Sequence, residues 1–217
     1  MRKRIIVAIC LVALLTPLAL AQRPQRVKQP SEQWTWLFDG KNLDNWVKVG
    51  NEKWEIEDGV IHGQGVTEKY GYLRTVKRYK DFYLSVRFKC LADGNSGVYF
   101  HTDFKPGTVD VSQGRQFEID RMLPHHNGGV YGDGLGWIAW PSPEFEAVMH
   151  PTDWNDMLMT VVGNHYQCYI NGIKVLDFVN PKQKANEGYI ALQLHSGGAG
   201  DMLFKDIAVL DLSNLEQ

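Results

Sequence analysis

The sequence has no long amphipathic helix: across 217 residues, apolar side chains never recur at helical spacing for three turns. Without helical crossovers, a parallel α/β sheet is disfavoured. No internal repeat is visible, which also disfavours a propeller. Glycine and aromatic residues are instead abundant, with 21 Gly, 7 Trp, 9 Tyr and 9 Phe. This composition is typical of short strands joined by tight turns.

Cysteine and clustered basic residues are scarce. The chain has three cysteines, of which Cys10 lies in an N-terminal apolar run. The sequence leaves open whether Cys90 and Cys168 pair, because it does not show that their Cα atoms come within ~7 Å. The 23 basic and 25 acidic residues form no dense basic patch, so no nucleic-acid partner is expected.

The first 21 residues have the pattern of a secretory signal peptide. A cationic MRKR is followed by the short apolar run IIVAICLVALL and by the small-x-small cleavage site Ala19-Leu20-Ala21. Thr16-Pro17 interrupts the apolar run, which is short of the ~20 residues of a transmembrane helix. We therefore expect no transmembrane anchor, and an exported, periplasmic or extracellular protein that begins near Gln22.

The remaining chain is expected to form one domain. Residues 22–33 are polar and proline-bearing, which predicts a flexible leader, and 213–217 would be a short C-terminal tail. Between them, residues 34–212 contain about a dozen extended segments separated by turn signals such as Asp58-Gly59, Gly163-Asn164 and Asn171-Gly172. This pattern predicts an all-β fold, an antiparallel sandwich of two sheets.

One of these segments, RQFEID, raises the question of function. On a strand, Gln116, Glu118 and Asp120 would share one face, and Phe117 and Ile119 the other. The apolar pair is expected in the core. The polar face could simply be solvated, but a row of amide and carboxyl groups is also typical of the floor of a polar binding site.

Two other segments present similar polar faces. Tyr99 and His101 would share a face in SGVYFHTD, and Gln193 and His195 in ALQLH. Glycine-rich loops, among them Asn95-Ser96-Gly97, would let the backbone approach a ligand closely. Loop tryptophans 137 and 140 offer flat apolar faces that suit sugar rings.

Taken together in order, several motifs resemble the secreted 3-keto-disaccharide hydrolase family, also described as 3-keto-glucoside 1,2-lyase/3-keto-2-hydroxy-glucal hydratase domains. The resemblance covers residues 34–212 and implies a concanavalin A-like jelly roll whose concave face cleaves 3-keto-glycosides. The motifs are LFDGKNLDNW (37–46), WEIEDGVIHG (54–63), GYLRT (71–75), YKDFYLSVRF (79–88), NSGVYFH (95–101), DWN (153–155), INGIKV (170–175), GYIALQLH (188–195) and the closing MLFKDIAVLDL.

Three positions depart from the family pattern. The usual glutamate-x-glutamine strand is here Gln116-Phe117-Glu118, with the acid and the amide exchanged. His101 stands where the family more often has arginine, and His150 where a lysine is common. Each exchange keeps the position polar.

The implied chemistry assigns roles to these side chains. A ketone at C3 acidifies the proton at C2, so a base at C2 and an acid at the glycosidic oxygen would eliminate the group at C1. We expect Glu118 to be the base, His195 the acid or second base, and Asp120 a neighbouring catalytic carboxylate. The expected substrate-binding residues are Arg74, Asn95, Tyr99, His101, Gln116, Tyr131, Gln193 and Trp137.

The sequence requires no cofactor, although a divalent metal held by Glu118, Asp120, His101 and His195 is an alternative. No H-x-H or HExxH spacing supports it. The expected partner is an oligosaccharide or a 3-keto-sugar, together with an oxidoreductase that would make the keto group.

Three other functions stay open. EIDRML resembles the E-x-D-x-x-E strand of laminarinase-type glycosidases, but Leu123 replaces the second catalytic glutamate, and direct hydrolysis needs two carboxyl groups that flank the bond. A non-catalytic, lectin-like carbohydrate-binding module fits the same fold, because fold alone does not decide function. An interaction domain would show no dependence on sugar at all.

Overall fold

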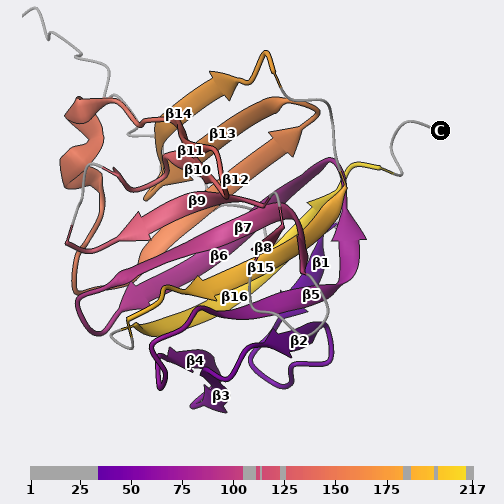
Figure 1. Cartoon of the computed structure of the whole chain (residues 1–217), viewed down its shortest axis with the longest axis vertical. Coiled ribbons are helices and arrows are strands. Elements are labelled where there is room, and N and C mark those ends of the chain that lie inside the picture. The colour runs from indigo at the N-terminus through magenta and orange to yellow at the C-terminus, as the bar shows by residue number, and fades with distance from the viewer. Residues whose placement is uncertain are drawn as a thin grey trace, which may run out of the picture. The chain divides into compact units, whose positions relative to one another are not determined.

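The computed structural model describes residues 34–104, 111–112, 114–122, 126–182, 187–197 and 200–213. These residues form two antiparallel sheets, each of eight strands, with an apolar core between them (Figure 1). The predicted all-β sandwich is confirmed. The expected signal peptide and leader, and residues 214–217 of the expected tail, lie outside the described residues.

The two sheets, called sheet A and sheet B, have the following strand orders. Sheet A follows the order β14 (Ile173–Val179), β13 (His165–Ile170), β12 (Asn155–Val162), β6 (Phe82–Cys90), β16 (Asp201–Asp211), β4 (Val60–Gln64) and β3 (Lys53–Glu57), with β1 (Thr35–Phe38) also paired to β16. Sheet B follows the order β11 (Gly136–Ala139), β10 (Val130–Gly132), β9 (Arg115–Asp120), β7 (Asn95–Phe104), β15 (Gly188–Leu194), β5 (Gly71–Tyr79) and β2 (Trp46–Val49), with β8 (Val111–Ser112) paired to β7. A 3-10 helix, η2 (Pro143–Val148), connects β11 to β12.

Strand alternation builds the core. Phe117 and Ile119 of β9 and Leu192 and Leu194 of β15 all point between the sheets and are at most 1% exposed. Each such side chain contributes roughly 1.5–3 kcal/mol when removed from water. The opposite faces of the same strands therefore point away from the core, and this outer face of sheet B carries the polar side chains.

The predicted tight hairpins are confirmed. Asp58 and Gly59 both have positive φ, at 50° and 77°, between β3 and β4. Asn171 and Gly172 repeat this at 52° and 83° between β13 and β14. Two consecutive left-handed residues are the type I′ turn, whose twist matches that of the paired strands.

A bulge in β7 overturns one prediction. His101 has a positive φ of 48°, and β7 advances from Tyr99 to Thr102 while β15 advances only from Ala191 to Tyr189. The extra residue reverses the alternation beyond it. His101 therefore does not share the face of Tyr99: its ring packs on Phe82 and Phe100 inside the sandwich.

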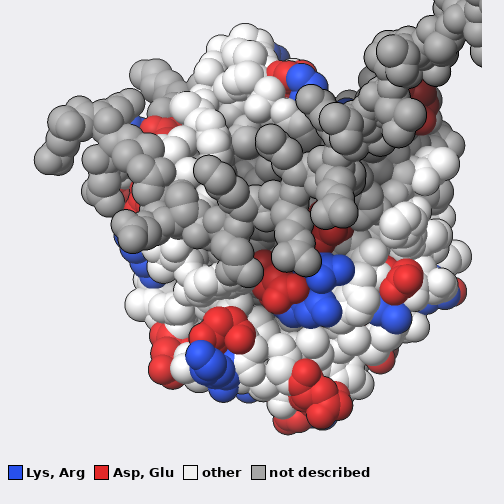
Figure 2. All heavy atoms as spheres, turned by 180° about the vertical axis from the view of Figure 1, so that it is seen from behind, with Lys and Arg blue, Asp and Glu red and all other residues white. Residues whose placement is uncertain are grey.

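The surface offers charges of both signs. Figure 2 shows Lys and Arg side chains interspersed with Asp and Glu where the described residues reach that face. Within the described part of the chain, no helix is long and apolar enough to cross a membrane. Cys90 and Cys168 are buried, unpaired thiols of sheet A.

Candidate carbohydrate site

A pocket of about 400 Å³ opens on the outer face of sheet B. Its size lies within the range of ~300–1,000 Å³ typical of small-molecule sites. Its walls come from strands β5, β7, β9, β10, β11 and β15 and from the loops at their ends. The lining residues are Tyr70, Tyr72, Asn95, Tyr99, Gln116, Glu118, Asp120, His126, Tyr131, Asp133, Gly134, Trp137, Gln193 and His195.

Strand register places the floor of this pocket. Gln193 pairs with Gly97, and Gly97 pairs with Glu118, so the three lie in one row across β15, β7 and β9. Gln193 on β15 and Glu118 on β9 therefore flank Gly97 on β7, each about 4.8 Å from it, the usual spacing of neighbouring strands. A Cβ at position 97 would lie 2.4 Å from the Gln116 Oε1 atom. The missing side chain of Gly97 therefore leaves the room in which Gln116 approaches Glu118.

Glu118 is the most perturbed acid of the pocket. It is 2% exposed, its Oε2 accepts a hydrogen bond from Gln116 Nε2 at 2.8 Å, and its Oε1 accepts one from Asn95 Nδ2. Burial raises the pKa of Glu118 to about 8; the Asn95 and Gln116 bonds oppose this rise, and the negative charge of Asp120 adds to it. No lysine or arginine accompanies Glu118 among the described residues that line the pocket.

Asp120 is held beside Glu118 rather than free to move. Its Oδ1 accepts the Met122 amide at 2.8 Å, and its Oδ2 lies 3.4 Å from Asn95 Nδ2. Asn127 ties the Asp120 backbone through both its amide oxygen and its amide nitrogen, at 2.8 and 2.9 Å. The structure thus places the two predicted carboxyl groups on one face of β9, where the negative charge of Asp120 helps to raise the pKa of Glu118.

A third acid, Asp133, faces the pocket from the turn after β10. Asp133 Oδ1 accepts a hydrogen bond from the Tyr99 hydroxyl at 3.1 Å, and that hydroxyl accepts one from Gln193 Nε2 at 3.3 Å. Burial raises the pKa of Asp133 to about 6, although the Tyr99 bond opposes the rise. The ring of Tyr72 packs edge-on against Tyr99, with centroids 5.5 Å apart, and supports this chain of bonds.

His195 stands at the end of β15 with one nitrogen facing the pocket. Its Nδ1 is 3.0 Å from the Ser196 carbonyl oxygen. Because a carbonyl only accepts, Nδ1 carries a proton, so Nε2 is the ring nitrogen that can take or give a proton at the pocket. The Tyr70 hydroxyl lies 3.4 Å from Nε2, and the two rings meet edge-on at 4.9 Å.

A buried carboxylate fixes the loop that supplies Tyr70. Glu52 is 4% exposed and accepts hydrogen bonds from the Thr67 amide at 3.0 Å, the Val66 amide and the Thr67 hydroxyl. A Cβ on Gly71 would collide with the Glu52 side chain at 2.2 Å. Backbone amides are strong hydrogen-bond donors to a buried carboxylate. Glu52 therefore fixes the backbone of residues 66–67 in the loop that leads to Tyr70 and β5.

Several buried acceptors of the pocket have no hydrogen-bond partner among the described residues. They are Oδ1 of Asn95, Oε1 of Gln116, Oε1 of Gln193 and Oδ2 of Asp133. An unsatisfied buried polar atom costs about 1–3 kcal/mol. The hydroxyl groups of a sugar would supply donors for these acceptors once their side-chain groups turn towards the ligand.

Aromatic rings form the rim at the β10–β11 side. The rings of Trp137 and Trp140 stack with centroids 4.1 Å apart, and Tyr131 meets Trp137 edge-on. His126 packs against both tryptophans, at 4.8 and 4.9 Å. Trp140 is 51% exposed, so this stack presents a flat apolar surface beside the polar floor.

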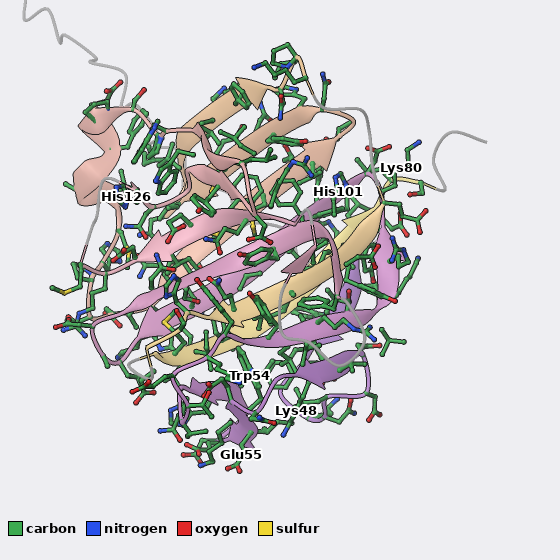
Figure 3. The ribbon with its side chains drawn as sticks, in the orientation of Figure 1. Lys48, Trp54, Glu55, Lys80, His101 and His126 are labelled. Atoms are coloured by element: carbon green, nitrogen blue, oxygen red, sulfur yellow. The ribbon has the colours of Figure 1, made fainter. Side chains whose placement is uncertain are left out.

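Two predicted binding residues lie elsewhere. His101 Nε2 is bonded to the Lys80 carbonyl oxygen at 2.6 Å, and Figure 3 shows it beside Lys80 and far from His126. Arg74 lies outside the pocket lining, with its guanidinium 4.1 Å from the Tyr189 ring centre and bonded to the Thr75 carbonyl. The bulge in β7 turns His101 away from the pocket, whereas Arg74 lies on the outer face but contacts Tyr189 and Thr75 instead.

The metal alternative fails with His101. Among the described residues, no three His, Cys, Asp or Glu side chains are grouped so that they could hold a metal ion. The remaining predicted site residues, from Asn95 and Tyr99 to Gln193 and Trp137, do line one pocket.

Sequence reasoning missed five residues of the pocket: Tyr70, Tyr72, His126, Asp133 and Gly134. Tyr72 could have been found, because alternation along GYLRT puts it on the face opposite Leu73, and the structure pairs it with Gln193. The other four lie outside regular strands, where no alternation rule predicts direction.

Comparison with known proteins agrees with this architecture. A family model described as a 3-keto-alpha-glucoside-1,2-lyase-like domain matches residues 33–210. The 3-keto-disaccharide hydrolase of Bacteroides thetaiotaomicron is 35% identical over 74 residues, which are 30% of this chain and 26% of that protein. The match therefore spans about a quarter of that relative's length.

Solved structures share the fold at low sequence identity. A Parabacteroides distasonis protein described as a "putative glycosyl hydrolase" gives a TM-score of 0.66 at 22% identity, with 85% of this chain and 98% of that chain covered. Carbohydrate-binding module CBM66 from Bacillus subtilis gives 0.59 at 13% identity, with 77% and 96% covered. The concanavalin A-like sandwich is thereby confirmed, and the match over residues 33–210 shows that this chain belongs to the family of 3-keto-alpha-glucoside-1,2-lyase-like domains, a carbohydrate-active family.

Proposed function

We propose that this protein cleaves 3-keto-glycosides by removing the proton at C2 and expelling the group at C1. The observation that carries the proposal is Glu118: a carboxyl group buried in a sugar-sized pocket, oriented by two amide donors, with its pKa raised to about 8. A structural carboxylate would be paired with a cation or left in water. A general base gains from a pKa near the working pH.

Two protein groups, Glu118 and His195, account for both proton transfers of the elimination. The Glu118 carboxylate takes the C2 proton, and the electron pair of the C–H bond forms a C1–C2 double bond conjugated with the ketone. The C1–O bond breaks with its electron pair, and the leaving oxygen takes a proton from the protonated form of His195. The unpartnered amide oxygens of Asn95, Gln116 and Gln193 would meanwhile accept the hydroxyl groups of the ring.

Hydration would complete a hydrolysis. Water adds its oxygen to C1 while the neutral Nε2 of His195 takes the water proton, and Glu118 returns its proton to C2. Both groups then regain their starting states. The Tyr70 hydroxyl, 3.4 Å from Nε2, holds the ring of His195 towards the pocket throughout.

The test is release of the alcohol from a 3-keto-glucoside by wild type, Glu118→Gln and the matched control Glu144→Gln, since Glu144 is exposed on η2. Release should fall at least about 100-fold in Glu118→Gln and stay unchanged in the control. Because the base must be ionised, the ionisation of Glu118 should make kcat/KM of wild type rise with pH towards about 8. Equal release by wild type and Glu118→Gln would contradict the assignment of the base.

Unoxidised glucosides belong in the same assay, because Asp133 supplies a second carboxyl group that the sequence did not locate. Equal release from oxidised and unoxidised substrates would replace elimination by direct two-carboxylate hydrolysis. A second candidate, sugar binding without catalysis, is favoured by the exposed Trp137–Trp140 stack and by the fold shared with CBM66. Binding of glucosides with no release from any of them would support that candidate.

The cellular setting is part of the proposal. The N-terminal pattern supports export, and the substrate requires a prior oxidation of the C3 hydroxyl group to a ketone. An oxidoreductase acting on the intact glycoside must therefore precede this protein.

A further inference from the structure

A second pocket, of about 670 Å³, adjoins the sugar pocket. It lies where the β10–β11 edge of sheet B meets the end of β14 in sheet A. Asp133 and Trp137 line both pockets, so these two side chains form a shared wall. The second pocket is lined by Arg115, Asp133, Leu135, Trp137, Ile138, Phe178, Asn180, Pro181 and Lys182.

The chemistry of the second pocket differs from that of the first. Leu135, Ile138, Phe178 and Pro181 give it an apolar surface, and Trp137 adds an aromatic one. The sugar pocket is lined instead mainly by amide, carboxyl and hydroxyl groups. A ligand that spans the shared wall would therefore have a polyhydroxylated part and an apolar part.

Local geometry directs Leu135 to this pocket. In the turn between β10 and β11, Leu135 lies between two glycines with positive φ, Gly134 at 69° and Gly136 at 74°. Leu135 is left 63% exposed, while Asp133, at the start of the same turn, is held towards the sugar pocket by Tyr99. A single exposed leucine is ordinary on a surface, but this one borders a pocket that Ile138 and Phe178 also line, and a ligand there would remove it from water.

We propose that the second pocket binds the leaving group of the substrate and selects for an apolar, aromatic alcohol at C1. The proposal rests on the function proposed above and names its substrate class. The sugar ring would occupy the polar pocket over Glu118, and the alcohol would cross between Asp133 and Trp137 to the apolar side. A second sugar ring is the competing occupant: Asn180 and Lys182 offer it hydrogen-bonding groups, whereas the aliphatic and aromatic part of the lining offers it none.

The experiment compares 3-keto-glucosides of benzyl alcohol, methanol and glucose. Benzyl alcohol and methanol are similarly poor leaving groups, so their comparison isolates binding from leaving-group chemistry. We expect kcat/KM to be highest for the benzyl glycoside. Leu135→Ser should lower the benzyl-to-methyl ratio of kcat/KM by about fivefold, as loss of a partly buried apolar contact would.

Val179→Ser is the matched control, because Val179 is 55% exposed beside Phe178 on β14 but is absent from the pocket lining. It should leave the ratio unchanged. Phe178→Leu, which keeps the side chain apolar, should lower the ratio less than Leu135→Ser. An unchanged ratio in Leu135→Ser, or a higher kcat/KM for the glucosyl substrate than for the benzyl one, would overturn the proposal.

Failure of the proposed function would look different. If no 3-keto-glycoside releases its alcohol, calorimetric titration with benzyl and methyl glucosides still tests the second pocket. Tighter binding of the benzyl glucoside, weakened in Leu135→Ser but not in Val179→Ser, would support the apolar site. Equal affinity for both glucosides would refute it.

Discussion

Glu118→Gln should stabilise the protein while abolishing its proposed activity, because the buried carboxyl group opposes folding at neutral pH. The ordinary pKa of a glutamate is 4.5, and burial raises that of Glu118 to about 8 in the folded chain. Between these two values the unfolded chain loses a proton that the folded chain keeps. Stability therefore falls as pH rises through this window, by about 1.4 kcal/mol per pH unit.

The magnitude follows from the width of the window. From pH 4.5 to 7 the loss accumulates to about 3 kcal/mol, and it levels off at about 5 kcal/mol above pH 8. A glutamine at position 118 does not titrate and avoids this loss. The variant should be indistinguishable from wild type near pH 4.5 and progressively more stable as the pH rises.

The surroundings can accept the new amide group. Glutamine brings an NH2 that would face either the Asn95 or the Gln116 donor, both now bonded to the carboxylate. Because Oδ1 of Asn95 and Oε1 of Gln116 have no partner among the residues that the structure describes, rotating one of these amides by 180° turns a clash of donors into a hydrogen bond.

The assay is urea unfolding at pH 5, 6, 7 and 8, followed by tryptophan fluorescence, for wild type, Glu118→Gln and Glu144→Gln. The gap between Glu118→Gln and wild type should widen with pH, whereas Glu144→Gln should track wild type. A variant that is less stable than wild type, or a gap independent of pH, would mean that Glu118 is ionised in the folded protein, and would refute the reasoning.

Two further predictions concern other parts of the molecule. In Gly97→Ala, the new Cβ would lie 2.4 Å from the Gln116 amide oxygen and should displace that amide. We expect kcat/KM to fall by about tenfold or more while the circular dichroism spectrum stays unchanged. Full activity would show that Gln116 does not orient the base. His62 lies between Glu57 and Asp201, 2.7 Å from each, and although burial lowers its pKa, these partners outweigh burial and raise it above 6.5. The stabilising effect of protonated His62 is complete below pH 6.5 and is lost as the pH rises through its raised pKa. His62→Gln should therefore lower the urea midpoint at pH 5.5 and hardly at pH 9. An equal loss at both pH values would show that the charge on His62 does not stabilise the fold.

Much of the site could be predicted from strand periodicity. Gln116, Glu118 and Asp120 do share the face opposite Phe117 and Ile119, because side chains on an unbroken strand alternate. The same rule predicts the direction of Tyr99, Gln193 and His195. What it could not predict is the environment: the raised pKa of Glu118 comes first from its burial, which depends on the strands and loops packed around it.

The sequence by itself determined which segments are strands, where the I′ turns at Asp58-Gly59 and Asn171-Gly172 fall, and which face of β9 is polar, because these properties depend on local backbone preferences. Only the tertiary structure decided which polar groups meet. The bulge that turns His101 inwards and the loop positions of Tyr70 and Asp133 follow from pairing and packing between segments far apart in the chain. Contacts of this kind belong to no single segment, so local pattern alone cannot specify them.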